Sequence, residues 1–220
     1  MKKTFVFAAI CAALFMANSA KAQLGINAGY LNNKETNKID YKLLPSIESD
    51  FTMNGFYLGV DYNINLKFGL GIDLGVNFEY LGGSKDEGAT LHERFTGISI
   101  PILANYKIDL GFGKVGVFVG PNFGIGLSNK GWFNDNKDAK IDYYGDDNES
   151  LNLNDNTVEL GYDRLQFGLT FGAAVQIFHY RINVAYTTGL NNVAPDKYQN
   201  DISKMESKSN NLIVGVGYVF

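Results

Sequence analysis

The sequence is dominated by segments in which apolar and polar residues alternate with a period of two. From Phe68 to Tyr80, every second residue is apolar or aromatic, and the residues between them are glycine, aspartate, asparagine or glutamate. Successive side chains of a β-strand point to opposite faces, so this pattern is typical of a strand with one apolar and one polar face. The pattern recurs in seven further segments, at residues 24–30, 56–64, 98–108, 115–127, 165–177, 182–186 and 212–220.

The apolar face of these eight segments carries no charged residue. A charge that faces lipid near the middle of a membrane costs about 2–4 kcal/mol, so such a face suits a bilayer. A sheet with one apolar and one polar face could also be half of a soluble β-sandwich. Several segments reach ten or more residues, however, which is the length of a tilted membrane strand. Every backbone N–H and C=O group in hydrocarbon must be hydrogen-bonded, so transmembrane strands have to close into a barrel. The sequence therefore predicts an all-β fold, a closed antiparallel up-and-down transmembrane β-barrel of about eight strands.

The connections between the segments alternate between short and long. The short ones lie around Asn65, at 109–114 and at 178–179, and the long ones at 34–50, 82–93, 128–162 and 191–209. Outer-membrane barrels have short periplasmic turns and long outer loops, so both termini are expected on the periplasmic side. Partial strand patterns at 140–144 and 151–160 leave a projecting hairpin, or a ten-stranded barrel, as an alternative for the region 128–162.

The first 22 residues have the features of a cleaved signal peptide. Lys2 and Lys3 precede an apolar stretch from 4 to 17, and Ala20-Lys21-Ala22 fits a small-x-small cleavage site. We expect export to the cell outer membrane and a barrel domain at residues 23–220. Cys11 lies in the removed segment, so the mature chain would have no thiol, disulfide or cysteine-based metal site.

The mature chain is expected to be acidic. Without Lys2, Lys3 and Lys21, 16 basic residues face 23 acidic ones, and no basic run occurs. Because nucleic-acid binding rests on neutralising phosphates, this charge argues against a nucleic-acid partner.

Three stretches carry a likeness to a known family. They are GISIPILANYK from Gly97, GVFVGPNFG from Gly116, and VGVGYVF ending at Phe220. With them the chain resembles the outer-membrane β-barrel domain proteins of Gram-negative bacteria labelled porin-family or PorT-like. The resemblance implies an architecture rather than a chemistry, and it implies that the terminal aromatics Tyr218 and Phe220 are recognised by the barrel-assembly machinery. Outer-membrane lipid and lipopolysaccharide are the other expected partners.

Six charged residues fall on the polar face, which points into the lumen of a barrel. The interior of an eight-stranded barrel is just wide enough for side chains to fill, and charges confined there must pair. The acids and bases balance, so we expect a polar network that plugs the lumen; a proton or ion path is the alternative. The residues are Asp61, Asp73, Glu79, Lys107, Arg164 and Arg181.

The sequence offers little for catalysis, and we predict no catalytic, cofactor or metal site. Its two histidines, His92 and His179, fall at opposite ends of the barrel, which excludes a two-histidine site. His92 with Glu93 and an outer-loop serine would be the basis of an outer-membrane hydrolase. The glycines from Gly111 to Gly116 match a dinucleotide fingerprint by letter, but they join two strands rather than a strand and a helix. The asparagines of 152–156 resemble the start of a calcium loop that lacks its turn glycine.

Aromatic residues in the third long connection are candidates for contact with a partner: Trp132, Phe133, Tyr143 and Tyr144. The sequence thus favours a non-enzymatic structural or interaction barrel that acts through its outer loops. A narrow porin-like transport barrel is the alternative, and a hydrolase is the third.

Overall fold

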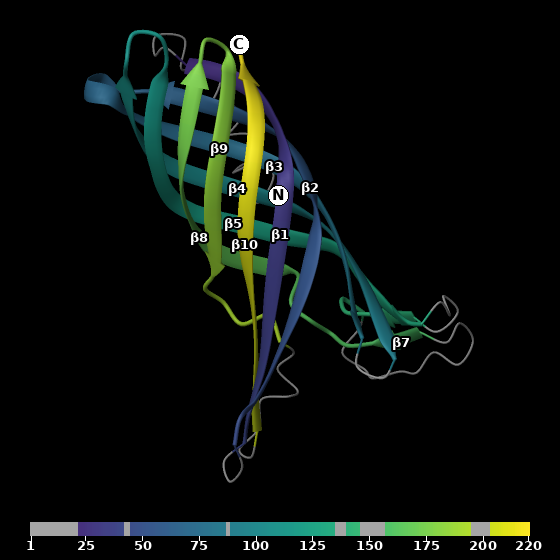
Figure 1. The fold of residues 1–220 in the computed structure, drawn as a ribbon. Coiled ribbons are helices and arrows are strands. Elements are labelled where there is room, and N and C mark those ends of the chain that lie inside the picture. Colours follow the sequence, from purple (N-terminus) through teal and green to yellow (C-terminus); the bar gives the residue numbers. More distant parts are fainter. Residues whose placement is uncertain (1–21, 42–44, 87–88, 135–139, 146–156, 195–202) are drawn as a thin grey trace, which may run out of the picture.

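The fold is described from a computed structural model that covers residues 22–41, 45–86, 89–134, 140–145, 157–194 and 203–220. Nearly all of this chain is β-strand (Figure 1). The predicted signal peptide lies outside the described residues except for Ala22, which begins the first strand. The strands are β1 Ala22–Tyr41, β2 Ile47–Asn65, β3 Leu70–Asp86, β4 Thr90–Asp109, β5 Lys114–Phe133, β6 Lys140–Asp142, β7 Thr157–Glu159, β8 Leu165–Ile177, β9 Tyr180–Gly189 and β10 Ser203–Val219; a 3-10 turn, η1, spans Lys67–Gly69.

Eight long strands close into a ring. The sheet order is β4-β3-β2-β1-β10-β9-β8-β5, and β4 also pairs with β5. Every neighbouring pair in this ring is antiparallel, including the first and last strands, β1 and β10. The predicted fold class is confirmed. The ten-stranded alternative is wrong, because β6 and β7 are three residues long and lie outside the ring, paired to the end of β5 and to each other.

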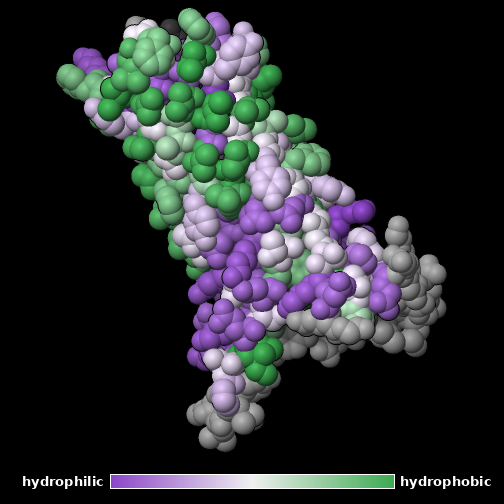
Figure 2. All heavy atoms as spheres, in the orientation of Figure 1, coloured by the Kyte–Doolittle hydropathy of each residue, from purple (hydrophilic) through white to green (hydrophobic). Residues whose placement is uncertain are grey.

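The outer surface of the ring is an apolar band. Large hydrophobic side chains point outward along all eight strands, and Val60 in the middle of β2 is 50% exposed. Figure 2 shows hydrophobic residues gathered over the part of the molecule that carries the short turns, and hydrophilic residues beyond it. Exposed apolar surface on this scale needs a lipid environment, as predicted from the alternation. Among the described residues, no helix is long and apolar enough to cross a membrane.

Several strands run well past the apolar band, at what we call the outer end, the end opposite the short turns. β1 and β2 pair from Ala22–Ile64 as far as Ile39–Ile47, and β3 and β4 pair as far as Asp86–Thr90. The expected loops 34–50 and 82–93 are therefore mostly strand, and in Figure 1 these extensions project as two arms. They were missed because the outward face turns polar where it leaves lipid, which removes the contrast between the two faces.

The interior differs in composition between its two halves. Near the outer end the inward-facing side chains form an apolar cluster: Leu31, Phe51, Met53, Tyr57, Leu81, Phe95 and Tyr144. Leu31 and Leu81 are almost fully buried, at 1% and 2% exposed. Burial of such a side chain contributes about 1.5–3 kcal/mol, so this cluster is a true hydrophobic core. The expectation of a polar inward face is correct for the half nearer the short turns, whereas near the outer end apolar and polar side chains share the interior.

The two prolines of the central strands lie where the ladders are interrupted. The β3–β4 pairing has a gap between Leu74–Ile102 and Asn77–Ser99, next to Pro101, with the same register on both sides. The β4–β5 pairing has a gap between Pro101–Asn122 and Ala104–Val119, where Pro121 lies; the register shift of this pair is at Thr96/Gly97. Proline has no backbone N–H to donate, so these gaps are where a closed barrel accommodates it.

Candidate functional site

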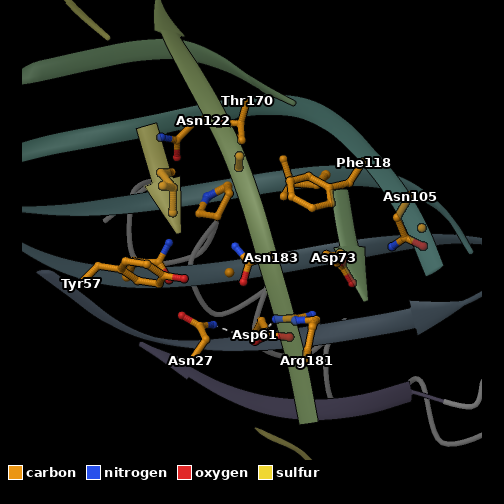
Figure 3. A pocket seen from close by; sticks show the side chains of 18 of the residues that line it. Asn27, Tyr57, Asp61, Asp73, Asn105, Phe118, Asn122, Thr170, Arg181 and Asn183 are labelled. Atoms are coloured by element: carbon orange, nitrogen blue, oxygen red, sulfur yellow. Dashed lines mark hydrogen bonds and ion pairs between the residues drawn. The ribbon is translucent and has the colours of Figure 1, made fainter. Parts of the chain in front are cut away.

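The best-defined polar contact in the lumen joins β2 to β9. Arg181 Nη2 donates to Asp61 Oδ1 over 2.7 Å, and both side chains are almost buried, at 12% and 8% exposed. Asn27 on β1 donates to the same oxygen over 2.7 Å (Figure 3). Three strands are thus tied together through one carboxylate.

A second pair lies beside the first. Lys107 on β4 places its Nζ 3.8 Å from Asp73 Oδ1 on β3, and the amide of Asn63 donates to the same oxygen. These two acids and two bases are the part of the six-residue network that the structure brings together. These two acids and two bases balance one another, and Lys114 also lines this half of the lumen.

The other two members of the predicted network lie apart. Glu79 is buried further along β3 and accepts a 2.5 Å hydrogen bond from the Ser99 hydroxyl. Arg164 precedes β8 at the outer rim and is exposed. Its guanidinium donates to the carbonyl oxygens of Tyr144, at 3.0 Å, and Leu127, at 3.3 Å. The alternation predicted a place for Arg164 in the lumen network, but Arg164 precedes β8 and is exposed at the outer rim.

The lumen contains a cavity of about 100 Å³ between these pairs and the apolar cluster. Asp61, Asp73, Asn105, Asn122 and Arg181 line it from five strands (Figure 3). Polar atoms of this lining, among them Asp61 Oδ2 and both amide atoms of Asn105, are buried with no protein partner. A polar space of this size has room for several waters, which would satisfy these atoms.

Two buried carboxylates that the sequence analysis did not place in the interior lie near the outer end. Glu35 on β1 accepts hydrogen bonds from the Ser207 hydroxyl, at 2.8 Å, and the Asn37 amide, at 3.2 Å. Glu93 on β4 is 5% exposed. Both stand beyond the apolar band, in the strand extensions. Glu35 could have been found from its phase, because Asn33, Glu35 and Asn37 continue the inward parity of Asn27.

Burial perturbs the ionisation of both groups. It raises the pKa of the Glu35 carboxyl above its usual range. Burial, reinforced by the charge of Glu35, raises the pKa of Glu93 to about 8. Burial likewise raises the pKa of the Tyr143 hydroxyl, with Glu93 and Glu35 adding to the effect. The ionised forms of Glu35, Glu93 and Tyr143 are therefore disfavoured unless a cation binds beside them.

This cluster predicts how stability depends on pH in metal-free buffer. A carboxyl whose folded-state pKa is raised binds its proton more tightly when folded, so its contribution is fully present below the unfolded pKa. The contribution is lost as the pH rises through the folded value. Stability should therefore fall between pH 5 and pH 9, and Glu93→Gln should flatten this dependence. Urea unfolding at a series of pH values measures it; an equal slope in the variant would contradict the assignment.

The four aromatic contact candidates do not share one environment. Tyr144 is buried in the apolar cluster, so its expected surface role is wrong. Tyr143 packs edge-on against Tyr162, with ring centroids 5.5 Å apart. Phe133 is exposed. Trp132 stacks on His92, with centroids 5.5 Å apart and an interplanar angle of 18°.

The geometry at His92 does not assemble a hydrolase. His92 stacks on the outward-facing Trp132, whereas Glu93, the next residue of β4, is buried in the interior. Adjacent strand residues point to opposite faces, so the two cannot act on one substrate. Within the described residues, no group of three or more histidine, cysteine or acidic side chains could hold a metal ion. The calcium-like stretch 152–156 lies outside the described residues.

The C-terminal aromatics lie at the end that carries the short turns. Tyr218 packs against Phe220, with centroids 5.2 Å apart, and stacks on His179 at 5.4 Å. His179 Nδ1 is 2.7 Å from the carbonyl oxygen of Val219. Phe220 is exposed on the outer surface. The role of these residues as an assembly signal stays a prediction.

Comparison with known proteins places the chain in a family. The model of the outer membrane protein beta-barrel domain matches residues 16–194. No curated protein sequence matches the chain. Similar solved structures include Ail, the attachment invasion locus protein of Yersinia pestis (15% identity, 90% of this chain and 99% of that one, TM-score 0.39), and Neisserial surface protein A (13%, 90% and 99%, TM-score 0.41). OprG from Pseudomonas aeruginosa is 12% identical over 91% of this chain and 97% of its own, with a TM-score of 0.47. The chain belongs to the outer membrane protein β-barrel domain family and is a protein of the cell outer membrane.

Proposed function

We propose that the protein is a non-enzymatic, non-conducting barrel whose outer rim binds the phosphate groups of lipopolysaccharide. The observation that carries this proposal is a row of basic and aromatic side chains just above the apolar band, which we call the rim patch: Tyr80, His92, Arg94, Lys130 and Trp132.

The rim patch is held together by contacts around one arginine. The Arg94 guanidinium carbon lies 5.5 Å from the centroid of the Trp132 ring and 5.9 Å from that of Tyr80. Lys130 on β5 pairs directly with Arg94 on β4, and both side chains are exposed. Two neighbouring strands therefore present two adjacent cations outward.

The height of the rim patch points to a lipid headgroup. Tyr80 is the outermost aromatic on the apolar face of β3, and Arg94 lies two residue pairs above it, opposite Gly82. Tyrosine and tryptophan favour the membrane interface, and cations there attract anionic lipids. Other cations of the extension are neutralised within the protein: Lys34 lies 2.6 Å from Asp50, and Lys208 lies 3.2 Å from Glu206. A phosphate of the outer leaflet is therefore a ligand of the right charge at the right height.

The interior supports a non-conducting role. The apolar cluster occupies the interior near the outer end, and its members Leu31 and Tyr57 also line the polar cavity. Transport would require this cluster to move aside, so the porin-like alternative has less support.

Binding of purified lipopolysaccharide to the detergent-solubilised barrel tests this proposal. We expect Arg94→Ala with Lys130→Ala to weaken binding at least tenfold, because both cations of the rim patch are lost. Lys34→Ala with Lys208→Ala is the matched control, which removes two paired cations and should leave binding within twofold. Undiminished binding by the first variant, or equal binding of dephosphorylated lipopolysaccharide, would refute the role of the rim patch.

A further inference from the structure

Within the described part of the chain, no cation is paired with Glu35 or Glu93, the acids of the outer half of the lumen. Near the short turns, Asp61 and Asp73 face Arg181 and Lys107. Glu35 and Glu93 near the outer end have hydrogen-bond donors, namely Ser207, Asn37, Asn129 and Tyr143, all of which are neutral. Buried carboxylates of this kind persist only if protons or a bound cation neutralise them.

Oxygen atoms around these acids lack partners. The amide nitrogen of Asn33 donates hydrogen bonds to Ser209 Oγ, at 2.5 Å, and to Asn211 Oδ1, at 2.6 Å. No donor among the described residues reaches the Oδ1 atom of Asn33. Asn129 donates to Glu93, and its Oδ1 is likewise buried without a partner, as is Glu93 Oε1. Asn33, Glu93 and Asn129 are 5%, 5% and 7% exposed. Every one of these unpartnered atoms is an oxygen that can accept a hydrogen bond or coordinate a cation.

A small cavity lies among these residues. It has a volume of about 30 Å³, and Asn33, Glu35 and Asn129 line it. This volume holds one ion or one to two waters. Asp163, which is exposed, lines the same cavity.

We propose that this cavity, between Asn33, Glu35 and Asn129 and beside Glu93, is a binding site for a calcium ion. Carboxylate and amide oxygens are ligands that calcium accepts in flexible geometry, whereas magnesium demands a near-ideal octahedron. The donors come from β1 on one side of the ring and from the neighbouring strands β4 and β5 on the other, so the ion joins opposite walls of the barrel mouth. Two carboxylates and amide oxygens form a donor set of modest charge, and the expected dissociation constant is about 0.1–1 mM, as in extracellular calcium modules.

Calcium titration of the lipopolysaccharide-free barrel in detergent, at pH 7.5 after chelation, tests this site. We expect CaCl₂ to raise the melting temperature saturably, with MgCl₂ at least tenfold less effective. Terbium luminescence excited through tyrosine should also rise, since Tyr143 and Tyr144 adjoin the acids. Because lipopolysaccharide has been removed, a calcium effect in this experiment cannot come from lipopolysaccharide bound at the rim patch.

Glu35→Gln and Glu93→Gln are the test variants, and Glu48→Gln on the exposed face of β2 is the matched control. Each test variant should weaken calcium binding at least tenfold while remaining folded, because glutamine keeps the shape and removes a buried charge. The control should bind as the unmutated protein does. No calcium effect on the unmutated barrel, or equal effects in test and control variants, would overturn the site and leave protons as the neutralising species.

Discussion

Arg181→Ala is expected to lower the free energy of unfolding of the barrel by about 3–5 kcal/mol, the cost of leaving a buried charge without its partner. The Arg181 guanidinium lies 2.7 Å from Asp61 Oδ1, and both side chains are almost buried. The loss of stability should come from the Asp61 carboxylate, which would be buried without a partner, rather than from the cavity left by the removed side chain. Urea unfolding of the reconstituted protein, followed by tryptophan fluorescence, measures it.

Two further variants isolate the cause. Asp61→Asn combined with Arg181→Ala should recover much of the loss, since no buried charge then remains. Lys34→Ala, which removes one partner of the exposed pair with Asp50, should cost about 0–1 kcal/mol. A double variant no more stable than Arg181→Ala alone would show that the pair is not what holds these strands together.

Val60→Arg is expected to cost about 2–4 kcal/mol, because Val60 lies in the middle of the apolar band and an arginine there faces hydrocarbon. Thr52→Arg is the matched control on the same strand. Thr52 has the same outward parity and is exposed, but it lies beyond the band in the extension of β2. Its substitution should cost no more than about 1 kcal/mol.

The comparison of these two variants in lipid vesicles tests which part of β2 is in the membrane. Equal losses at both positions would mean that the apolar band does not contact lipid. Equal solubility of the unmutated barrel with and without detergent would lead to the same conclusion.

The ring of strands was predictable because lipid imposes one rule on every strand. Val60 and its counterparts must be uncharged, and the residues between them face a different environment, so period-two alternation marks each crossing. Closure followed from the need to pair backbone groups. The same reasoning placed Asp61, Asp73, Lys107 and Arg181 in the lumen.

Features outside the membrane were not predictable in this way. Glu35 and Glu93 lie in strand extensions beyond the apolar band, in segments that the sequence analysis expected to be loops. Tyr144 enters the barrel from an irregular segment, which has no period to reveal its direction. Arg164 was predicted to join the lumen network, but it precedes β8 and is exposed at the outer rim.

Ion conductance in planar bilayers tests the central claim most directly, which is that the barrel is closed by side chains near its outer end. The unmutated protein should give no stable single-channel conductance, because the cluster around Leu31 and Leu81 occupies the interior near the outer end. Replacing both leucines by glycine should create conductance if the cluster is the barrier. A large and steady conductance from the unmutated barrel, abolished by changes at Asp61 or Arg181, would contradict the account and establish a transport role.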